Sequence, residues 1–129
     1  MTRYEVIGVG GIGEVRPGDD IARLIVEALR STAAPVVGVS PIVGGAAVSG
    51  PAAALMRVRG LAVSPLGVAA AYAPWLRRLL IDERDQACAP ELARAGVEAD
   101  PADIIMTTRA HETALARRIL ELSAERRAR

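Results

Sequence analysis

The sequence predicts an α/β protein with a short, largely parallel β-sheet and helices on both faces. Three observations carry this prediction. Short apolar runs alternate along the chain with longer amphipathic segments, as in folds that alternate strands and helices. The runs at residues 35–39 and 79–82 are almost entirely apolar, which is typical of strands buried on both faces of a parallel sheet. Gly, Pro, Ser and Asp gather at the ends of these segments, where turns and helix caps are expected.

The first half of the chain supplies two strands and two helices in this prediction. Residues 4–9 (YEVIGV) have strand composition and a glycine-rich end. Asp19 is the expected N-cap of a helix over residues 20–30, which has an apolar face. A buried strand follows at residues 35–39, and Pro51 suits the first position of a helix that Gly60 ends. The apolar face of the first helix consists of Ile21, Leu24, Ile25 and Ala28.

The second half continues the alternation. Ser64 and Pro65 are typical of an N-cap followed by a first-turn proline, and they predict a helix toward Tyr72. A buried strand is expected at residues 79–82, then a helical segment that Pro90 interrupts and Gly96 closes. A short strand at residues 97–100 precedes an amphipathic tail helix from about residue 109. The apolar face of this tail contains Leu115, Ile119 and Leu122.

Composition bounds the function. A chain of 129 residues is expected to form a single compact domain. Its net charge of +1 and aromatic content of 2% give no support to nucleic-acid binding. The one cysteine excludes a disulfide framework and favours the reducing cytoplasm. No long apolar region of a signal peptide is seen, and proline and glycine break the uncharged run at residues 31–56, so no membrane association is expected.

A glycine pattern near the start is a weak motif. Gly8, Gly10 and Gly13 satisfy G-x-G-x-x-G directly after the first expected strand. A dinucleotide site needs its helix to open within that turn, and here Pro17 and Gly18 postpone the helix. The second strand also ends in Ser40, where an acidic residue would hold the ribose. The context therefore argues against a dinucleotide-binding fold.

The loop at residues 40–50 is the stronger candidate site. It leaves the carboxyl end of an expected strand, where ligands sit in open parallel sheets, and it leads into a helix N-terminus at Pro51. Glycine backbone N–H groups and the hydroxyls of Ser40 and Ser49 could bind a phosphate. A tight strand-to-helix connection would use the same glycines, and the sequence favours neither reading. The loop contains no Lys or Arg, so a phosphate would rely on neutral donors or a metal.

Acidic residues follow the strand at residues 79–82. Asp82, Glu83 and Asp85 could hold Mg²⁺ with its waters, or they could cap the following helix. Capping is the simpler interpretation. His111 has no partner by spacing and is expected at the exposed start of the last helix. Cys88 lies among small residues and is expected to fill the core.

The run VVGVSPIVGGAAVSGPAAALMRVRGLAVSPLGVAAAY, followed by LLIDERD, resembles the C-terminal part of the 2-phospho-L-lactate transferases of coenzyme F420 biosynthesis. The resemblance covers about residues 34–122. It implies a Rossmann-like core and a transfer of a phospholactyl or phosphoenolpyruvyl group from a guanosine diphosphate carrier to a deazaflavin hydroxyl. That acceptor is 7,8-didemethyl-8-hydroxy-5-deazariboflavin, and GMP is released with Mg²⁺ as cofactor.

The resemblance also implies site residues. The loop residues that match the family's run are expected beside the nucleotide phosphates. Asp82, Glu83 and Asp85 match the family's I-D-E-x-D run, whose expected role is near the site or structural, and Asp82 and Asp85 are the candidate metal ligands. The family usually has basic residues near Ala46 and Ser49, which this chain lacks. The predicted phosphate-binding residues are Ser40, Pro41, Gly44, Gly45, Ser49 and Gly50.

Residues 11–29 (GIGEVRPGDDIARLIVEAL) instead resemble the start of the coenzyme F420-0:L-glutamate ligases. The expected organisation is therefore a ligase-like strand and helix at residues 1–33 and a transferase-like α/β domain at residues 34–129. By this resemblance a GTP site would use Ile12, Gly13, Glu14 and Val15. The transferases' N-terminal half has no counterpart, which implies a chain that is incomplete as an enzyme on its own.

Three functions remain open from the sequence. The first is a transferase acting on small molecules, and the second is a GTP-dependent ligase fragment. The third is a non-catalytic nucleotide-binding or assembly module, in which apolar faces pair with a second copy or with a full-length pathway protein.

Overall fold

The structure, a computed structural model, describes residues 14–124. The chain divides into two units, Met1–Ala34 and Pro35–Arg129, and each is described by itself. The expected strand at residues 4–9 and the glycine pattern that follows it lie outside the described residues. The division does not test the family assigned to each segment, so both assignments stay predictions.

The first unit contains one described helix, α1 (Ile21–Ser31). Its N-cap is Asp20, whose carboxylate accepts a hydrogen bond from the Arg23 N–H at 3.0 Å. The expected N-cap, Asp19, instead closes the preceding turn and accepts a hydrogen bond from the Arg16 N–H at 2.7 Å. With two adjacent aspartates, the spacing of the backbone N–H groups decides which one caps, and the sequence prediction was wrong by one residue.

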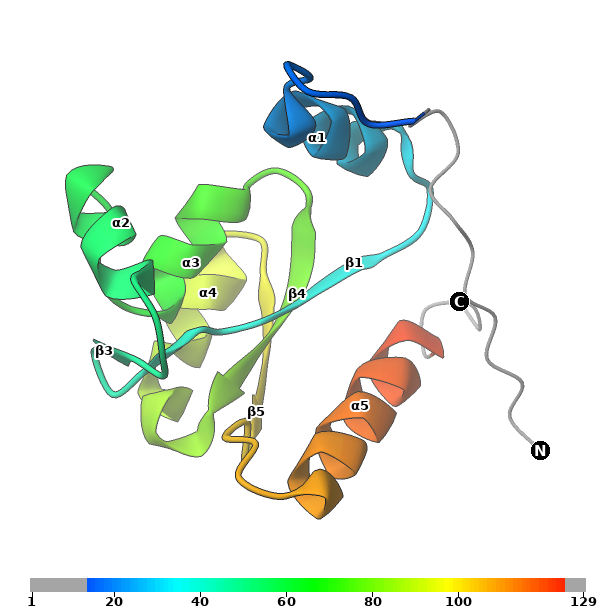
Figure 1. The fold of residues 1–129 in the computed structure, drawn as a ribbon. Coiled ribbons are helices and arrows are strands. Elements are labelled where there is room, and N and C mark those ends of the chain that lie inside the picture. Colours follow the sequence, from blue (N-terminus) through cyan, green and yellow to red (C-terminus); the bar gives the residue numbers. More distant parts are fainter. Residues whose placement is uncertain (1–13, 125–129) are drawn as a thin grey trace. The chain divides into compact units, whose positions relative to one another are not determined.

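A three-stranded parallel sheet forms the centre of the second unit (Figure 1). Strand β4 (Leu76–Asp82) lies between β1 (Val36–Val39) and β5 (Glu98–Ala102) and pairs in parallel with both. The predicted α/β, Rossmann-like class is confirmed. Strand β4 begins three residues earlier than predicted, because Arg77 and Arg78 interrupt the apolar run, and Arg78 pairs with Glu98 on β5 at 2.8 Å.

A small β-hairpin stands where the sequence predicted a loop. Strands β2 (Ile42–Val43) and β3 (Ala46–Ala47) pair in antiparallel fashion around Gly44 and Gly45. Both glycines have positive φ, 57° and 79°, as the two central residues of a type I′ turn require. The pattern V-G-G-A contains this signal, since Gly-Gly between short apolar pairs is typical of a two-residue hairpin.

Helices connect the strands and cover the sheet. Ser64 caps α3 through the Gly67 N–H, and Pro65 stands in its first turn, as predicted. The segment after β4 begins as a 3₁₀ helix, η1, before α4 continues it. Leu115 and Leu122 of the tail helix are buried, which confirms its predicted apolar face. The bounds are α2 (Ala52–Val58), α3 (Pro65–Tyr72), η1 (Glu83–Cys88), α4 (Ala89–Arg94) and α5 (Arg109–Ala124).

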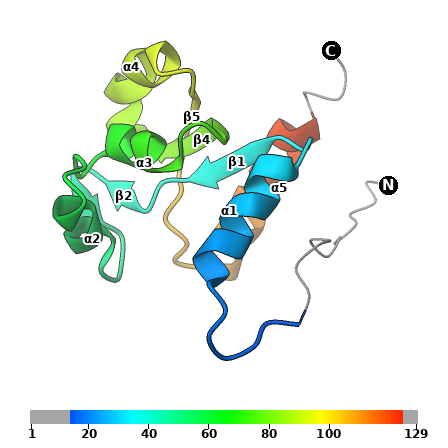
Figure 2. The same cartoon turned by 90° about the horizontal axis from the view of Figure 1, so that it is seen from above.

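The sheet has an apolar core on each face, and Figure 2 shows α3 and α4 on one side of it and α5 on the other. Leu79 and Ile81 of β4 pack toward the helices α2, α3 and α4, whereas Leu80 packs with Leu115 and Leu122 of α5. This alternation explains why β4 has no polar residue between Leu79 and Ile81. Within the described residues, no helix is long and apolar enough to cross a membrane.

Candidate functional site

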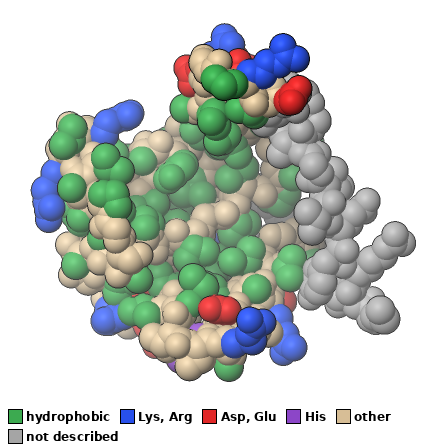
Figure 3. All heavy atoms as spheres, in the orientation of Figure 1, with side chains coloured by type: hydrophobic (Ala, Val, Ile, Leu, Met, Phe, Trp, Pro, Cys, Tyr) green, Lys and Arg blue, Asp and Glu red, His purple; other side chains and the backbone are tan. Residues whose placement is uncertain are grey.

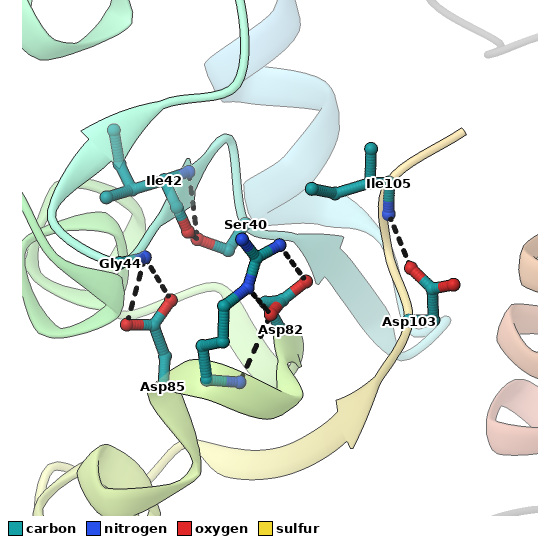
Figure 4. A network of polar contacts seen from close by, with 8 residues as sticks. Ser40, Ile42, Gly44, Asp82, Asp85, Asp103 and Ile105 are labelled. Atoms are coloured by element: carbon teal, nitrogen blue, oxygen red, sulfur yellow. Dashed lines mark hydrogen bonds and ion pairs between the residues drawn. The ribbon is translucent and has the colours of Figure 1, made fainter. Parts of the chain in front are cut away.

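Some of the polar residues singled out from the sequence lie at the carboxyl edge of the sheet. The three parallel strands end there together, β1 before Ser40, β4 at Asp82 and β5 before Asp103. Figure 4 shows Ser40 and Asp82 between Gly44 and Asp85 on one side and Asp103 on the other. Ligands of open parallel sheets bind beyond this edge, so the topology places the candidate residues where a site is expected.

Ser40 anchors the hairpin through hydrogen bonds of both its backbone N–H and its hydroxyl. Its backbone N–H donates to the Leu80 carbonyl at 2.9 Å, which continues the ladder between β1 and β4. Its hydroxyl donates to the Ile42 carbonyl at 2.8 Å and accepts from the Ile42 N–H at 3.1 Å. The residue is buried, so this hydroxyl shapes the turn out of β1 and faces its own backbone, not solvent.

Asp85 holds the tip of the hairpin. Both of its carboxylate oxygens accept from the Gly44 N–H, at 3.0 and 3.2 Å, across 41 residues of sequence. Asp85 is buried, whereas Gly44 and Gly45 are exposed, and a Cβ built on either glycine meets no atom within 4 Å. The turn therefore presents open backbone to solvent while one of its N–H groups already binds a carboxylate.

Asp82 binds Arg84, two residues further along. Its carboxylate accepts hydrogen bonds from the Arg84 backbone N–H at 3.1 Å, from Nε at 2.6 Å and from Nη2 at 3.2 Å. The Asp82 side chain is 5% exposed and that of Arg84 is 61% exposed. The hydrogen bonds from Arg84 hold the pKa of Asp82 below its usual value of 3.8, against the opposing effect of burial. The pair is charge-assisted and fixes Arg84 at the edge of the sheet.

The two candidate metal ligands do not fit Mg²⁺ in this arrangement. Mg²⁺ needs carboxylate or carbonyl oxygens that face it. Here Asp82 directs its oxygens to Arg84 and Asp85 directs its oxygens to Gly44. Within residues 14–124, no group of three or more His, Cys, Asp or Glu side chains is arranged to hold a metal ion. The predicted capping role of Asp82 is confirmed, since it caps η1.

Comparison with known proteins identifies relatives of this edge and its loop. The chain is 45% identical over 87 residues to a 2-phospho-L-lactate transferase of Methanosarcina barkeri, a match that covers 67% of the chain. The 2-phospho-L-lactate transferase of Methanopyrus kandleri is 34% identical and matches 97% of the chain. A phosphoenolpyruvate transferase of Streptomyces griseus is 36% identical and matches 95% of the chain.

The chain is similar to 2-phospho-L-lactate transferases. The resemblance predicted from the sequence is confirmed by these matches, which cover the C-terminal portion of the relatives. The chain spans 28%, 40% and 37% of the length of the three relatives. No family model matches the chain. The two longer matches cover nearly the whole chain and so take in residues before position 34, and the ligase-like character of residues 11–29 stays a prediction.

The structure brings together only part of the residue set that the transferase resemblance implied. Ser40 and Gly44 lie at the carboxyl edge with Asp82 and Asp85. The other predicted residues are exposed, and they precede the hairpin, form its turn or follow it toward α2. Their role in phosphate binding stays a prediction. These residues are Pro41, Gly45, Ser49 and Gly50.

The residues implied by the ligase resemblance belong to the first unit. Ile12 and Gly13 lie outside the described residues. Glu14 and Val15 are exposed, and the Glu14 carboxylate lies 3.8 Å from the Arg16 guanidinium. This is the geometry of a solvated surface ion pair, and GTP binding by these residues stays a prediction.

The two remaining candidates, His111 and Cys88, make contacts that are typical of structural residues. His111 is exposed in the first turn of α5, where its Nδ1 lies 2.8 Å from the Thr107 hydroxyl. Cys88 is partly buried and packs against the core of α2, α3 and α4, which confirms its predicted role as a core filler. Burial raises the pKa of the Cys88 thiol, which disfavours the reactive thiolate.

Sequence reasoning missed two residues of this edge. Arg84 lies inside the quoted run LLIDERD, yet only its acidic neighbours were considered. Asp103 directly follows β5, and its carboxylate accepts from the Ile105 N–H at 3.3 Å. Both could have been found, because residues that follow parallel strands meet at one edge of the sheet once the strand order is known.

The pair of Asp82 and Arg84 predicts a pH dependence of stability. Because the pKa of Asp82 is lowered on folding, its contribution is present above the unfolded value, near 3.8, and is lost as the pH falls through the lower folded value. The Asp82→Asn variant should lose this contribution. We expect its melting temperature to fall less than that of the wild type between pH 7 and pH 3, as measured by circular dichroism. Equal falls in both proteins would contradict the prediction.

Proposed function

We propose that the second unit carries part of the guanine-nucleotide phosphate site of a transferase in coenzyme F420 biosynthesis. One observation carries this proposal. An exposed two-glycine turn lies at the carboxyl edge of a parallel sheet, within the segment that is similar to 2-phospho-L-lactate transferases. Open backbone at this edge allows phosphate oxygens to approach closely, since a Cβ built on either glycine meets no atom within 4 Å.

The proposed reaction is a transfer at phosphorus. The hydroxyl oxygen of the deazaflavin forms a new bond to the phosphorus that carries the three-carbon acid, either lactate or enolpyruvate. The bond between that phosphorus and the bridging oxygen of the diphosphate breaks, and GMP leaves with the electron pair. The hydroxyl proton passes to solvent. Catalysis of such transfers rests on positioning and on electrostatic stabilisation, and no covalent intermediate with the protein is needed.

In this reaction the role of the chain is to position the diphosphate. The hairpin is fixed at its base by the Ser40 hydroxyl and at its tip by Asp85, so the glycine turn has a defined place at the edge. Mg²⁺ belongs to the proposal as an ion carried by the diphosphate itself, because Mg²⁺ is commonly held by substrate phosphates and water. When bound, it would neutralise charge on the leaving GMP. Asp82 and Asp85 are not assigned to it.

The test of the proposed function is a release assay. The purified chain is mixed with the deazaflavin and the guanosine diphosphate carrier, with Mg²⁺, and GMP is measured by chromatography. GMP that forms in proportion to the chain supports the proposal. No GMP from a chain that melts cooperatively would contradict activity of this chain alone, and the GDP titration below then decides whether the nucleotide site exists.

A substitution in the glycine turn should weaken nucleotide binding without unfolding the hairpin. Gly44→Asn keeps a residue that tolerates positive φ, and Asn-Gly is a favoured pair in type I′ turns. Its side chain would occupy the open space beside the turn. We expect affinity for GDP, measured by calorimetric titration, to fall about 10-fold through lost close approach.

The matched control is Gly96→Asn. Gly96 also has a positive φ, 80°, and a Cβ built on it also meets no atom within 4 Å. It precedes β5 and so lies at the amino end of that strand, away from the proposed site. We expect this variant to bind GDP as the wild type does. Equal GDP affinity of a folded Gly44→Asn protein and the wild type would argue against phosphate at the turn.

A second candidate function is a non-catalytic assembly module. It is favoured by exposed apolar side chains on and before α2, where Val48 is 48%, Leu55 60% and Val58 86% exposed. Figure 3 shows hydrophobic side chains gathered on the surface in this region. Such a patch is typical of contact surfaces. Sedimentation at several concentrations tests it, since a mass that rises with concentration supports pairing of this chain with itself.

A further inference from the structure

Arg84 provides a positive charge at the carboxyl edge of the sheet, which the neighbouring loop does not provide. It follows the central strand β4 by two residues. Its neighbour Asp85 binds the Gly44 N–H, so Arg84 and the glycine turn are linked through adjacent residues. The loop at residues 40–50 contains no Lys or Arg of its own. The fold therefore brings a guanidinium to an edge that seemed to offer only neutral donors.

Asp82 orients this guanidinium and leaves part of it available. A guanidinium has five N–H donors in a planar fork. The hydrogen bonds to Asp82 use Nε–H and one N–H of Nη2. Within the described residues, no hydrogen bond from Nη1 is present, and the side chain is 61% exposed. A carboxylate that is almost completely buried thus holds one edge of the fork, while the side chain as a whole stays largely exposed.

The charges around Arg84 are mostly negative. The hydrogen bond to Asp82 is the largest of the effects that raise the pKa of Arg84, and the charges of Asp82, Asp85 and Asp103 add to it. Arg84 is therefore always charged. A phosphate that approached this edge would be repelled by three carboxylates, of which Asp103 is exposed. Arg84 is the cation that offsets this repulsion.

The geometry points to Arg84 as a phosphate-binding residue, whose N–H groups not bonded to Asp82 contact the diphosphate of a nucleotide. This inference rests on the proposed function and names a residue for it. Guanidinium groups are well suited to phosphate because they offer parallel donors and are weakly hydrated. Asp82 then acts as a positioning residue, since it contacts the phosphate only through Arg84.

The inference predicts opposite effects at two neighbouring positions. Arg84→Gln should weaken GDP binding about 10- to 100-fold, the usual effect of losing hydrogen bonds to a charged group. Arg84→Lys keeps the positive charge but loses the planar fork of donors. Its affinity for GDP should therefore lie between those of the wild type and Arg84→Gln. Asp103→Asn removes an exposed negative charge and keeps an oxygen for the Ile105 N–H, so it should strengthen GDP binding several-fold at low salt.

The matched control is Arg118→Gln. Arg118 also forms a bidentate pair, with Asp100 in β5, and it lies on α5. This variant loses the same charge and a similar ion pair without touching the carboxyl edge. All proteins are titrated with GDP and with guanosine by calorimetry, and melting curves recorded beforehand show that each variant is folded.

The outcomes separate the inference from the proposed function. Weaker GDP binding in Arg84→Gln, unchanged binding in Arg118→Gln and stronger binding in Asp103→Asn support the inference. If the wild type binds GDP and Arg84→Gln binds it equally, Arg84 has no such role while the nucleotide site stands. If the folded wild type binds neither GDP nor guanosine, the nucleotide site and the inference both fail.

Discussion

Replacing Gly67 with alanine is expected to lower the free energy of unfolding by about 3 kcal/mol, at the upper end for overpacked cores. A Cβ at this position would lie 1.8 Å from the Ala62 carbonyl oxygen and 2.9 Å from the Met56 methyl group. The carbonyl belongs to the turn that enters α3, so backbone would have to move. Thermal unfolding should show a loss on the order of 10–20 °C.

Gly38→Ala provides the comparison. Its Cβ would meet only side chains, with Leu76 Cδ1 at 2.9 Å and Leu79 Cδ1 at 3.2 Å. Such side chains can shift, so we expect a loss of about 1 kcal/mol. If the two alanine variants melted at the same temperature, the close contact between α3 and the Ala62 carbonyl would not be present in solution.

Replacing a buried leucine of the central strand β4 with alanine should be as destabilising. Leu79 and Leu80 are both fully buried, and they face opposite cores of the sheet. Each substitution by alanine should cost about 2–5 kcal/mol, because a cavity remains in addition to the lost burial. That is a large part of the roughly 5–15 kcal/mol by which domains are stable. Urea unfolding followed by circular dichroism measures the loss.

Hydrogen exchange distinguishes the two faces. Leu80→Ala should reduce amide protection mainly in α5, whereas Leu79→Ala should reduce it mainly in α3 and α4. The control is Leu55→Ala, at a side chain that is 60% exposed, with an expected change within about 0.5 kcal/mol. Loss of protection spread equally over all helices in both core variants would contradict two separate cores.

The elements of the second unit were largely predictable because their signals are local. Ser64 and Pro65 predicted the start of α3, and the alternation of apolar runs with amphipathic segments predicted a parallel sheet. The errors also have local causes. Arg77 and Arg78 hid the first half of β4, since a charged residue can stand at a strand end when it has a partner such as Glu98. The hairpin at Gly44 and Gly45 was overlooked in favour of a loop.

The candidate site was less predictable because its residues act across the sequence. The run at residues 40–50 was recognised by its glycines and by its resemblance to a family. That Asp85 would bind Gly44, and that Asp82 would bind Arg84, is invisible in spacing alone. A metal was predicted at these aspartates because carboxylates are common metal ligands. What each carboxylate binds is decided instead by the hydrogen-bond donors that it faces.

By itself, the sequence determined the fold class, most helix starts and the family that the chain resembles. These follow from apolar periodicity, from capping residues and from the run of residues that resembles the transferases. All three are properties of residues that are close together in the sequence. Only the tertiary structure decided which polar groups share an edge. The strand order β1-β4-β5 brings Ser40, Asp82 and Asp103 together, because parallel strands place all their carboxyl ends on one side.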